Sequence, residues 1–221
     1  MEPFVYNALP GRIVFGRGTL AMVADEVAAL GRGRAFVLST PQQADVGDAL
    51  ARQLGEMCVG TFAGAAMHTP VDVTARAIAA VTAAGADCLV AIGGGSTTGL
   101  GKAIALRTDL PQIVLPTSYA GSEMTPVVGQ TSGGIKTTQS SPKILPEIVI
   151  YDVDLTLTLP VGLTVTSGLN AIAHAGRHPS QGLCRQARDA ARVGKRLAED
   201  PGTDRPGGSP RRLGDVLTRA P

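Results

Sequence analysis

The chain has 221 residues, of which 44% are hydrophobic and 17% charged, and its net charge is +2. That length suits one domain with a smaller further segment and excludes a large multidomain protein, while the hydrophobic share excludes disorder throughout. The near-neutral charge and the seven aromatic residues, none of them tryptophan, argue against a nucleic-acid partner.

The three cysteines lack paired spacing, which argues against a disulfide framework or a cysteine-ligated zinc. No apolar run approaches the roughly 20 residues that a membrane-spanning helix needs, and the N-terminus lacks the layout of a signal peptide. We therefore expect a cytoplasmic protein with no membrane partner.

Short apolar runs alternate with helical patterns through the first 175 residues. The runs at Phe4–Tyr6 and Arg12–Phe15 surround a proline and a glycine, which predicts an added hairpin. Five later runs are typical of buried parallel strands: Arg34–Ser39, Met57–Phe62, Cys88–Ile92, Gln112–Leu115 and Glu147–Tyr151. The helical patterns between them are Thr19–Leu30, Ala44–Leu54, Val71–Ala84 and Thr98–Leu106. This order predicts an α/β fold with a Rossmann-like parallel sheet and helices on both faces.

A glycine-rich turn, Gly93 to Ser96, lies between a predicted strand and a predicted helix. Glycine lets backbone N–H groups approach a ligand closely, and a helix N-terminus attracts an anion, so we interpret the turn as a pyrophosphate site. The alternative is a plain strand-to-helix turn capped by Ser96. Two better-known phosphate motifs do not fit. A Walker loop requires a serine or threonine after Lys102, and the dinucleotide fingerprint requires glycine where Thr98 stands.

Two further segments carry polar side chains. The stretch Val114–Thr125 is rich in hydroxyl groups and lies where open α/β sheets bind ligands, so it is a candidate for contacts with ribose or phosphate. A solvated loop is the alternative. In the stretch Ser167–His174, Asn170 and His174 are four residues apart and share one face if the segment is helical. A structural role for this histidine is the alternative there.

The composition changes near Ala175. Gly176–Pro221 holds ten lysines and arginines against five acidic residues, and it contains no aromatic residue. Such a segment buries no core of its own, although Gln181–Ala198 has the pattern of one amphipathic helix. The abrupt change is typical of a truncated or frameshifted reading frame, so we expect impaired activity.

Three segments in this order resemble the iron-containing alcohol dehydrogenase superfamily, and its maleylacetate reductase branch more closely: Gly93–Lys102, Pro116–Pro126 and Ser167–Ala175. The resemblance covers Phe4–Ala175. It implies a dehydroquinate-synthase-like N-terminal α/β domain that binds NADH or NADPH, and an all-helical C-terminal domain that supplies much of the substrate site. Members of that branch are oxidoreductases that reduce maleylacetate to 3-oxoadipate in aromatic-compound catabolism.

The resemblance also implies a division of the chain. Residues 1–160 are expected to form the NAD(P)-binding domain, and residues 161–175 the first helix of the helical domain. Residues 176–221 are expected to form an Arg-, Gly- and Pro-rich tail, with the rest of the helical domain missing.

Carried over by position, the resemblance implies a set of cofactor contacts. Gly94, Gly95 and Ser96 are expected to face the pyrophosphate. Along the adenosine and nicotinamide parts, the expected contacts are Thr117, Ser118, Ser122 and Thr125, with Lys136 near the ribose. Neutral residues, Ser39 and Thr40, stand where NAD-specific folds commonly place an acid, so we expect both NADH and NADPH to bind.

The resemblance bears on metal binding as well. Asn170 and His174 take the first two metal-ligand positions of the metal-using relatives, which have aspartate in place of Asn170. A neutral amide is a poor ligand for iron or zinc, so we expect no metal. His174 then becomes the expected catalytic contact with a small dicarboxylate substrate. Gly99 also departs from the wider family, which commonly has aspartate there.

Other functions remain open from the sequence. One is a nucleotide-binding protein without turnover. Another is a metal-dependent alcohol or polyol dehydrogenase, or a dehydroquinate-synthase-like lyase, on a related scaffold. A homodimer is also left open.

Overall fold

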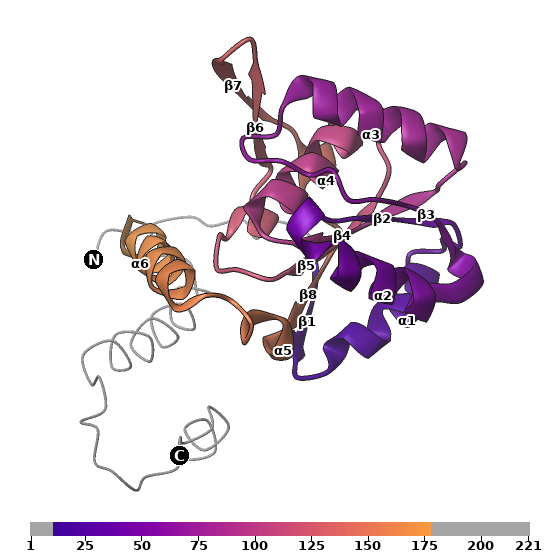
Figure 1. The fold of residues 1–221 in the computed structure, drawn as a ribbon, viewed down its shortest axis with the longest axis horizontal. Helices are drawn as coiled ribbons and strands as arrows, with labels where there is room; N and C mark the ends of the chain where they lie inside the picture. The colour runs from indigo at the N-terminus through magenta and orange to yellow at the C-terminus, as the bar shows by residue number, and fades with distance from the viewer. Residues whose placement is uncertain (1–10, 178–221) are drawn as a thin grey trace, which may run out of the picture.

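The structure is a computed structural model that describes the backbone of residues 11–177 and the side chains of residues 11–172. Figure 1 shows a twisted sheet between two layers of helices, with a small hairpin and one helix standing apart from it. The strands are β1 (Arg12–Gly16), β2 (Ala35–Leu38), β3 (Cys58–Phe62), β4 (Cys88–Gly93), β5 (Gln112–Pro116), β6 (Val127–Ser132), β7 (Ile135–Ser140) and β8 (Ile148–Asp152). The helices are α1 (Val23–Ala29), α2 (Ala44–Leu54), α3 (Val71–Ala83), α4 (Gly95–Thr108), α5 (Val153–Thr156) and α6 (Val161–Arg177).

Six strands form one fully parallel sheet in the order β1-β8-β5-β4-β2-β3. From β2 the chain passes through α2 to β3 on one side, whereas from β4 it passes through α4 to β5 on the other side. The direction of winding therefore reverses between β2 and β4. In open α/β sheets the crevice at the carboxyl ends of such strands is the usual ligand site.

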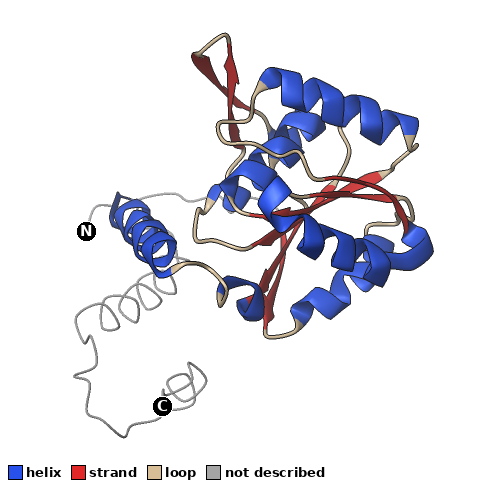
Figure 2. Ribbon diagram, viewed as in Figure 1, coloured by secondary structure: helices blue, strands red, loops and turns tan. Residues whose placement is uncertain are grey.

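Helices cover both faces of the sheet, as Figure 2 shows. The first face packs against α1 and α2, and its core includes Val27, Leu50, Val90 and Ile113. The second face packs against α3 and α4, and its core includes Ala77, Leu89, Leu100 and Ile104. Because both faces are covered, β2, β4 and β5 are buried along their whole length, which explains their continuous apolar sequences. The predicted α/β fold is confirmed.

Strands β6 and β7 form a separate antiparallel hairpin, which the sequence pattern did not predict. The turn between them is Gly133-Gly134, and both glycines have positive φ angles, of 54° and 79°. Two adjacent positive φ angles are what a tight hairpin turn of this kind requires. A bridge between Pro70 and Thr131 connects the hairpin to the segment that precedes α3.

Two of the predicted elements need correction. Arg12–Phe15 was predicted as the second strand of an added hairpin, but β1 instead pairs in parallel with β8 at the edge of the main sheet. Its partner in that prediction, Phe4–Tyr6, lies outside the described residues. Helix α4 begins at Gly95 and not at Thr98, so the glycine-rich turn itself forms the helix N-terminus.

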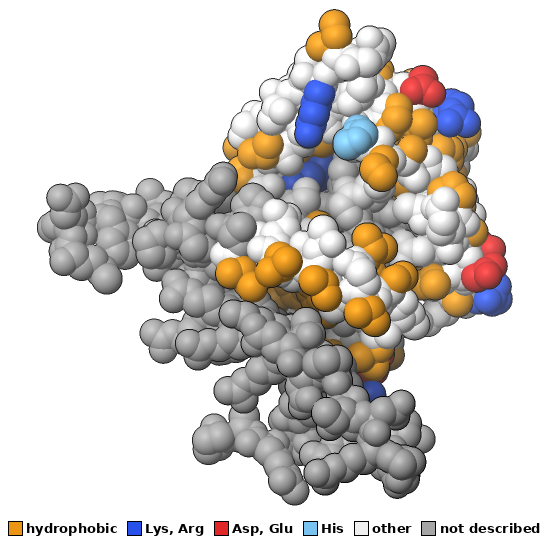
Figure 3. Space-filling view, turned by 60° about the vertical axis from the view of Figure 1, so that its left-hand side comes forward, with side chains coloured by type: hydrophobic (Ala, Val, Ile, Leu, Met, Phe, Trp, Pro, Cys, Tyr) orange, Lys and Arg blue, Asp and Glu red, His pale blue; other side chains and the backbone are white. Residues whose placement is uncertain are grey.

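Helix α6 begins at Val161, the position expected for the first helix of a second domain, and carries an exposed apolar surface. Val161, Leu163 and Leu169 are all more than half exposed, and Figure 3 shows hydrophobic side chains on this side of the molecule. Its contact with the sheet domain includes Ser167, whose Oγ accepts a hydrogen bond of 3.0 Å from the backbone N–H of Tyr119. The predicted helix at Gln181–Ala198 lies outside the described residues. No helix of the described part combines the length and apolar character that crossing a bilayer requires.

Candidate functional site

The glycine-rich turn connects β4 to α4 at the carboxyl end of β4, beside that of β2, where open α/β sheets commonly form a ligand crevice. Gly93 has a φ of 153° and leaves no room for a side chain. A β-carbon there would lie 2.9 Å from Oε1 of Gln43 and would collide with Oγ1 of Thr97. The turn therefore requires glycine at position 93, and this keeps the backbone open to the crevice.

The first turn of α4 offers free backbone donors. Gly94 is the N-cap residue, and no side chain caps this helix end. The N–H groups of Thr97 and Thr98 both bond to the carbonyl of Gly94, each at 3.1 Å. The preceding N–H groups, of Gly95 and Ser96, have no acceptor among the described residues. Together with the positive end of the helix dipole, they form a site suited to an anion.

A buried hydroxyl beside this helix end also lacks a partner. Thr97 is fully buried, and its Oγ1 makes no hydrogen bond within the described part of the chain. Buried hydroxyl groups are nearly always satisfied by protein, water or ligand. The Thr97 hydroxyl is thus an unsatisfied group packed beneath the glycine turn, with no surface of its own facing a ligand.

The end of β5 lies directly beside the turn. The backbone N–H of Thr117 donates to the carbonyl of Gly93 at 3.0 Å, and the Thr117 hydroxyl accepts a bond of 3.0 Å from Nε2 of Gln43. Ser118 lies across from Gly94, with its Oγ 3.1 Å from where a β-carbon on Gly94 would be. The structure thus brings together the predicted contacts Gly94, Gly95, Ser96, Thr117 and Ser118.

A buried lysine fixes the shape of the following loop. Lys102 is fully buried, and its Nζ donates to the carbonyls of Ser122, Thr125 (2.6 Å) and Val127 (3.0 Å). It also bonds the hydroxyl of Thr125 at 3.1 Å and lies 3.4 Å from that of Ser122. Burial lowers the pKa of Lys102 to about 8, although the nearby charge of Glu123 opposes this. The predicted contacts Ser122 and Thr125 are thus held in place by one ammonium group.

Glu123 connects the loop to β8. Its carboxylate accepts a 2.9 Å hydrogen bond from the hydroxyl of Tyr151, and the glutamate is 4% exposed. Burial raises the pKa of Glu123, while the Tyr151 hydrogen bond and the charge of Lys102 lower it by less. Burial and the adjacent carboxylate raise the pKa of Tyr151, so its hydroxyl remains a donor. The side chains of Lys102, Glu123 and Tyr151 thus connect the loop to α4 and β8.

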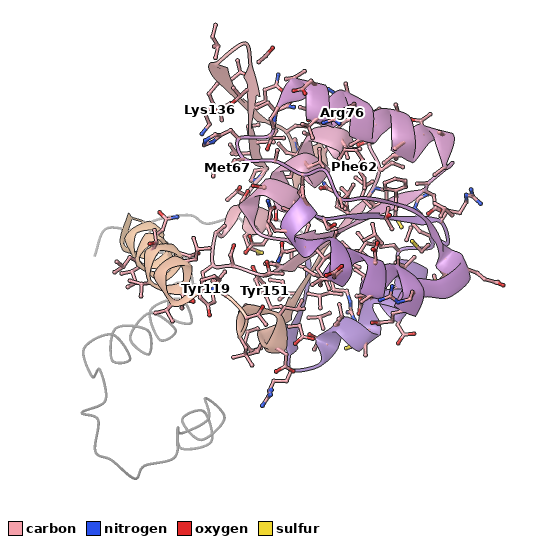
Figure 4. The ribbon with its side chains drawn as sticks, viewed as in Figure 1. Phe62, Met67, Arg76, Tyr119, Lys136 and Tyr151 are labelled. Carbon is pink, nitrogen blue, oxygen red and sulfur yellow. The ribbon has the colours of Figure 1, made fainter. Side chains whose placement is uncertain are left out.

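Three further predicted residues are not among those gathered at the turn. Lys136 is an exposed residue of β7 whose side chain crosses Gly129 on β6, and Figure 4 shows it on the hairpin, apart from Tyr119 and Tyr151. Ser39, predicted to face the adenosine ribose, is 3% exposed beneath Gly47 of α2, which leaves Thr40 as the accessible hydroxyl. His174 belongs to the backbone of α6, but its side chain lies outside the described residues.

The departure at Gly99 has a local explanation. A β-carbon on Gly99 would collide with Oγ1 of Thr69, which is 5% exposed. Thr69 and the preceding His68 both have positive φ angles, of 48° and 62°. An aspartate at position 99 would therefore require the Thr69 hydroxyl to move.

Sequence reasoning missed Gln43 and the roles of Thr97 and Lys102. Gln43 forms part of a polar turn with no motif, and its contact with Thr117 spans 74 positions. The sequence did contain one indication of the role of Lys102, because it is a charged residue within the buried run Leu100 to Ala105 of α4. Among the described residues, no group of three or more His, Cys, Asp or Glu side chains is placed to hold a metal ion.

Comparison with known proteins identifies relatives of this chain. A maleylacetate reductase from Rhizobium sp. strain MTP-10005 is 65% identical over 175 residues, which cover 79% of this chain and 50% of that protein. The crystal structure of maleylacetate reductase from Agrobacterium tumefaciens matches with a TM-score of 0.78 and 64% identity, over 79% of this chain and 50% of that one. This chain thus spans about half the length of these relatives.

A more distant solved structure was determined with a cofactor. Sulfoacetaldehyde reductase from Bifidobacterium kashiwanohense, in complex with NAD+, matches with a TM-score of 0.73 and 25% identity, over 78% of this chain and 53% of that one. The sequence model of the iron-containing alcohol dehydrogenase family matches residues 10–153, which include β1 to β8 and the glycine-rich turn. The chain therefore belongs to the iron-containing alcohol dehydrogenase family.

Proposed function

We propose that this chain binds NADH or NADPH through the glycine-rich turn and serves the reduction of maleylacetate to 3-oxoadipate. The observation that carries the proposal is the open N-terminus of α4, which presents the two free backbone N–H groups of Gly95 and Ser96. A dinucleotide fits this site because its pyrophosphate supplies the acceptors that these donors lack.

Different residues around the crevice would contact different parts of the cofactor. The N–H groups of Gly95 and Ser96 would donate to the pyrophosphate, and the absence of a side chain at Gly94 would let it approach. Ser118 and the Ser122–Thr125 turn would border the rest of the cofactor. Hydrogen bonds from Lys102 would hold that turn in position. The bound cofactor supplies the hydride, and the protein supplies orientation and electrostatics.

The proposed substrate is supported by the names of the related proteins. Two of the proteins described above carry the name maleylacetate reductase at 64% and 65% identity. We propose a small unsaturated dicarboxylate as substrate, with His174 on α6 as a polar contact. We also propose a protein that works in the cytoplasm without a nucleic-acid partner, and a homodimer as one form of its assembly.

We further propose that the reaction needs no bound metal. The support is the donor chemistry of α6, where Asn170 offers a neutral amide at a position occupied by aspartate in metal-using relatives. Elemental analysis of the purified protein tests this. Iron or zinc in a one-to-one ratio with the chain would contradict it and favour a metal-dependent alcohol dehydrogenase.

Titration of NADH fluorescence with the purified chain tests the cofactor assignment. We expect saturable binding of one NADH for each chain, weakened by at least about a hundredfold in Gly94→Val. Oxidation of NADH in the presence of maleylacetate tests the reaction. Binding without oxidation would favour a nucleotide-binding protein without turnover, whereas absence of binding would contradict the proposed function as a whole.

A further inference from the structure

Gln43 reaches across the crevice at the point where the winding of the sheet reverses. It belongs to the short helical turn Pro41–Gln43 that follows β2, yet its side chain contacts the ends of β4 and β5. Its Nε2 donates to Oγ1 of Thr117 at 3.0 Å, and its Oε1 lies 3.5 Å from Oγ1 of Thr40. The three strand ends β2, β4 and β5, which Figure 1 shows side by side, thus meet at one amide group.

The direction of these hydrogen bonds determines what Thr117 offers to a ligand. An amide nitrogen only donates, so the Thr117 oxygen must accept the bond from Gln43. The single hydrogen of that hydroxyl is then left over. No acceptor for it is found in the part of the chain that the structure describes, although Thr117 is only 6% exposed. A buried hydroxyl hydrogen requires an acceptor, and an anionic oxygen is the strongest one.

We propose that Gln43 is a positioning residue which orients the Thr117 hydroxyl as a donor to the cofactor's phosphate groups. This inference rests on the proposed function, because it takes the anion in the crevice to be a dinucleotide pyrophosphate. Gln43 acts through Thr117. The Gln43 amide donates to the Thr117 oxygen, and this directs the hydrogen of the Thr117 hydroxyl to the ligand. The Gln43 oxygen faces Thr40, whose Oγ1 lies 3.5 Å away.

The orientation role makes a different prediction from a scaffolding role. In Gln43→Glu the side chain keeps its size but its carboxylate only accepts, so the Thr117 hydroxyl must turn and donate to residue 43. The added charge would also repel phosphate. In Gln43→Met the size is similar, and the Thr117 hydroxyl stays free to rotate. Orientation therefore predicts that Gln43→Glu binds NADH more weakly than Gln43→Met. Charge repulsion predicts the same order, so the double variant Gln43→Met/Thr117→Val is what distinguishes orientation from scaffolding.

The test measures NADH affinity by fluorescence titration for Gln43→Met, Gln43→Glu, Thr117→Val and the double variant Gln43→Met/Thr117→Val. Gln53→Met is the matched control. Gln53 also lies between β2 and β3, but its side chain donates to the carbonyl of Leu20 and not to Thr117. Thr117→Ser keeps the hydroxyl and serves as the conservative replacement. The midpoint of thermal unfolding of each variant shows whether it remains folded.

Loss of one hydrogen bond to a charged group is expected to weaken binding by about tenfold or more. We expect about tenfold for Thr117→Val and a smaller loss for Gln43→Met, because its Thr117 hydroxyl can still rotate towards the ligand. The double variant should bind no more weakly than Thr117→Val, because Gln43 acts only through that hydroxyl. Gln43→Glu should bind more weakly than Gln43→Met. Thr117→Ser and Gln53→Met should bind within about threefold of the unaltered chain.

Two results would overturn the inference while leaving the proposed function intact. One is independent losses that multiply in the double variant, and the other is tighter binding by Gln43→Glu than by Gln43→Met. If the unaltered chain does not bind NADH, the proposed function fails and this inference fails with it. Titration with inorganic pyrophosphate as competitor distinguishes the phosphate contact from a contact with the adenosine or nicotinamide.

Discussion

Gly93 and Gly94 are neighbours in the turn, yet substitutions at the two positions should have opposite consequences. In Gly93→Ala the β-carbon would collide with Thr97 and approach Oε1 of Gln43 to 2.9 Å, on a backbone with a φ of 153°. Strain of such a backbone costs about 1–3 kcal/mol, and overpacking costs about another 1–3 kcal/mol. We expect Gly93→Ala to lose about 2–6 kcal/mol of the 5–15 kcal/mol that typically stabilises a domain.

Gly94→Val should leave most of that stability in place. The backbone at Gly94 has φ −82° and ψ −161°, which any residue adopts, and its nearest neighbour is Oγ of Ser118 at 3.1 Å from the added β-carbon. A small shift of that hydroxyl relieves the contact, so we expect a loss below about 2 kcal/mol. The valine side chain would nevertheless occupy the space in front of the α4 N-terminus. NADH binding should weaken by at least about a hundredfold, or roughly 2.7 kcal/mol.

Thermal unfolding and NADH titration of the two variants separate these effects. At about 2–4 °C for each kcal/mol, Gly93→Ala should lower the unfolding midpoint by roughly 4–24 °C, and Gly94→Val by less than about 8 °C. The reasoning is refuted if Gly94→Val is folded and binds NADH with unchanged affinity. It is equally refuted if Gly93→Ala is as stable as the unaltered chain, because the turn would then tolerate a side chain.

Three further outcomes are expected. Lys102→Met removes the ammonium that donates to three carbonyls and should destabilise the chain by about 2–4 kcal/mol in urea unfolding, at about 1 kcal/mol for each bond; an unchanged midpoint would mean that water replaces the ammonium. Burial raises the pKa of Glu123 in the folded chain, so its stabilising effect is greatest at acid pH and is lost as pH rises through that pKa. The unfolding free energy of the native chain relative to Glu123→Gln should therefore fall between acid and neutral pH, and a constant difference would contradict the assignment. NADH and NADPH should bind within about tenfold of each other, a gap of roughly 1.4 kcal/mol, because Ser39 is buried and Thr40 is neutral; a hundredfold preference for NADH would reveal an acidic group against the ribose.

The main sheet could be predicted because its strands are buried on both faces. Continuous apolar runs at β2, β4 and β5 follow directly from that burial, and α2 occupies the predicted residues Ala44–Leu54. The β6–β7 hairpin could not be found in this way. All six residues of β7 are exposed, so they carry no hydrophobic signal, and only Gly133-Gly134 marked the turn.

The glycine-rich turn was recognisable because a single local stretch of sequence carries it. The residues that shape its surroundings act over long separations in the chain. Gln43 reaches Thr117 across 74 positions, and Lys102 reaches the carbonyl of Val127 across 25. Backbone carbonyls belong to every residue type, so no sequence pattern marks them as the partners of a buried lysine.

The environment of Lys102 is comparable to that of a coordinated metal ion. Oxygen atoms from one short turn surround a buried cation, but here the cation is attached to the chain by a side chain of α4. A chelator cannot remove this cation, because it is covalently part of the chain. The Ser122–Thr125 turn should therefore keep its shape in the presence of chelators. Because burial also shields the ammonium from dissolved ions, the turn should stay ordered across a wide range of salt concentration. The loop beside the cofactor crevice thus has the order of an ion-binding loop without depending on a supply of ions.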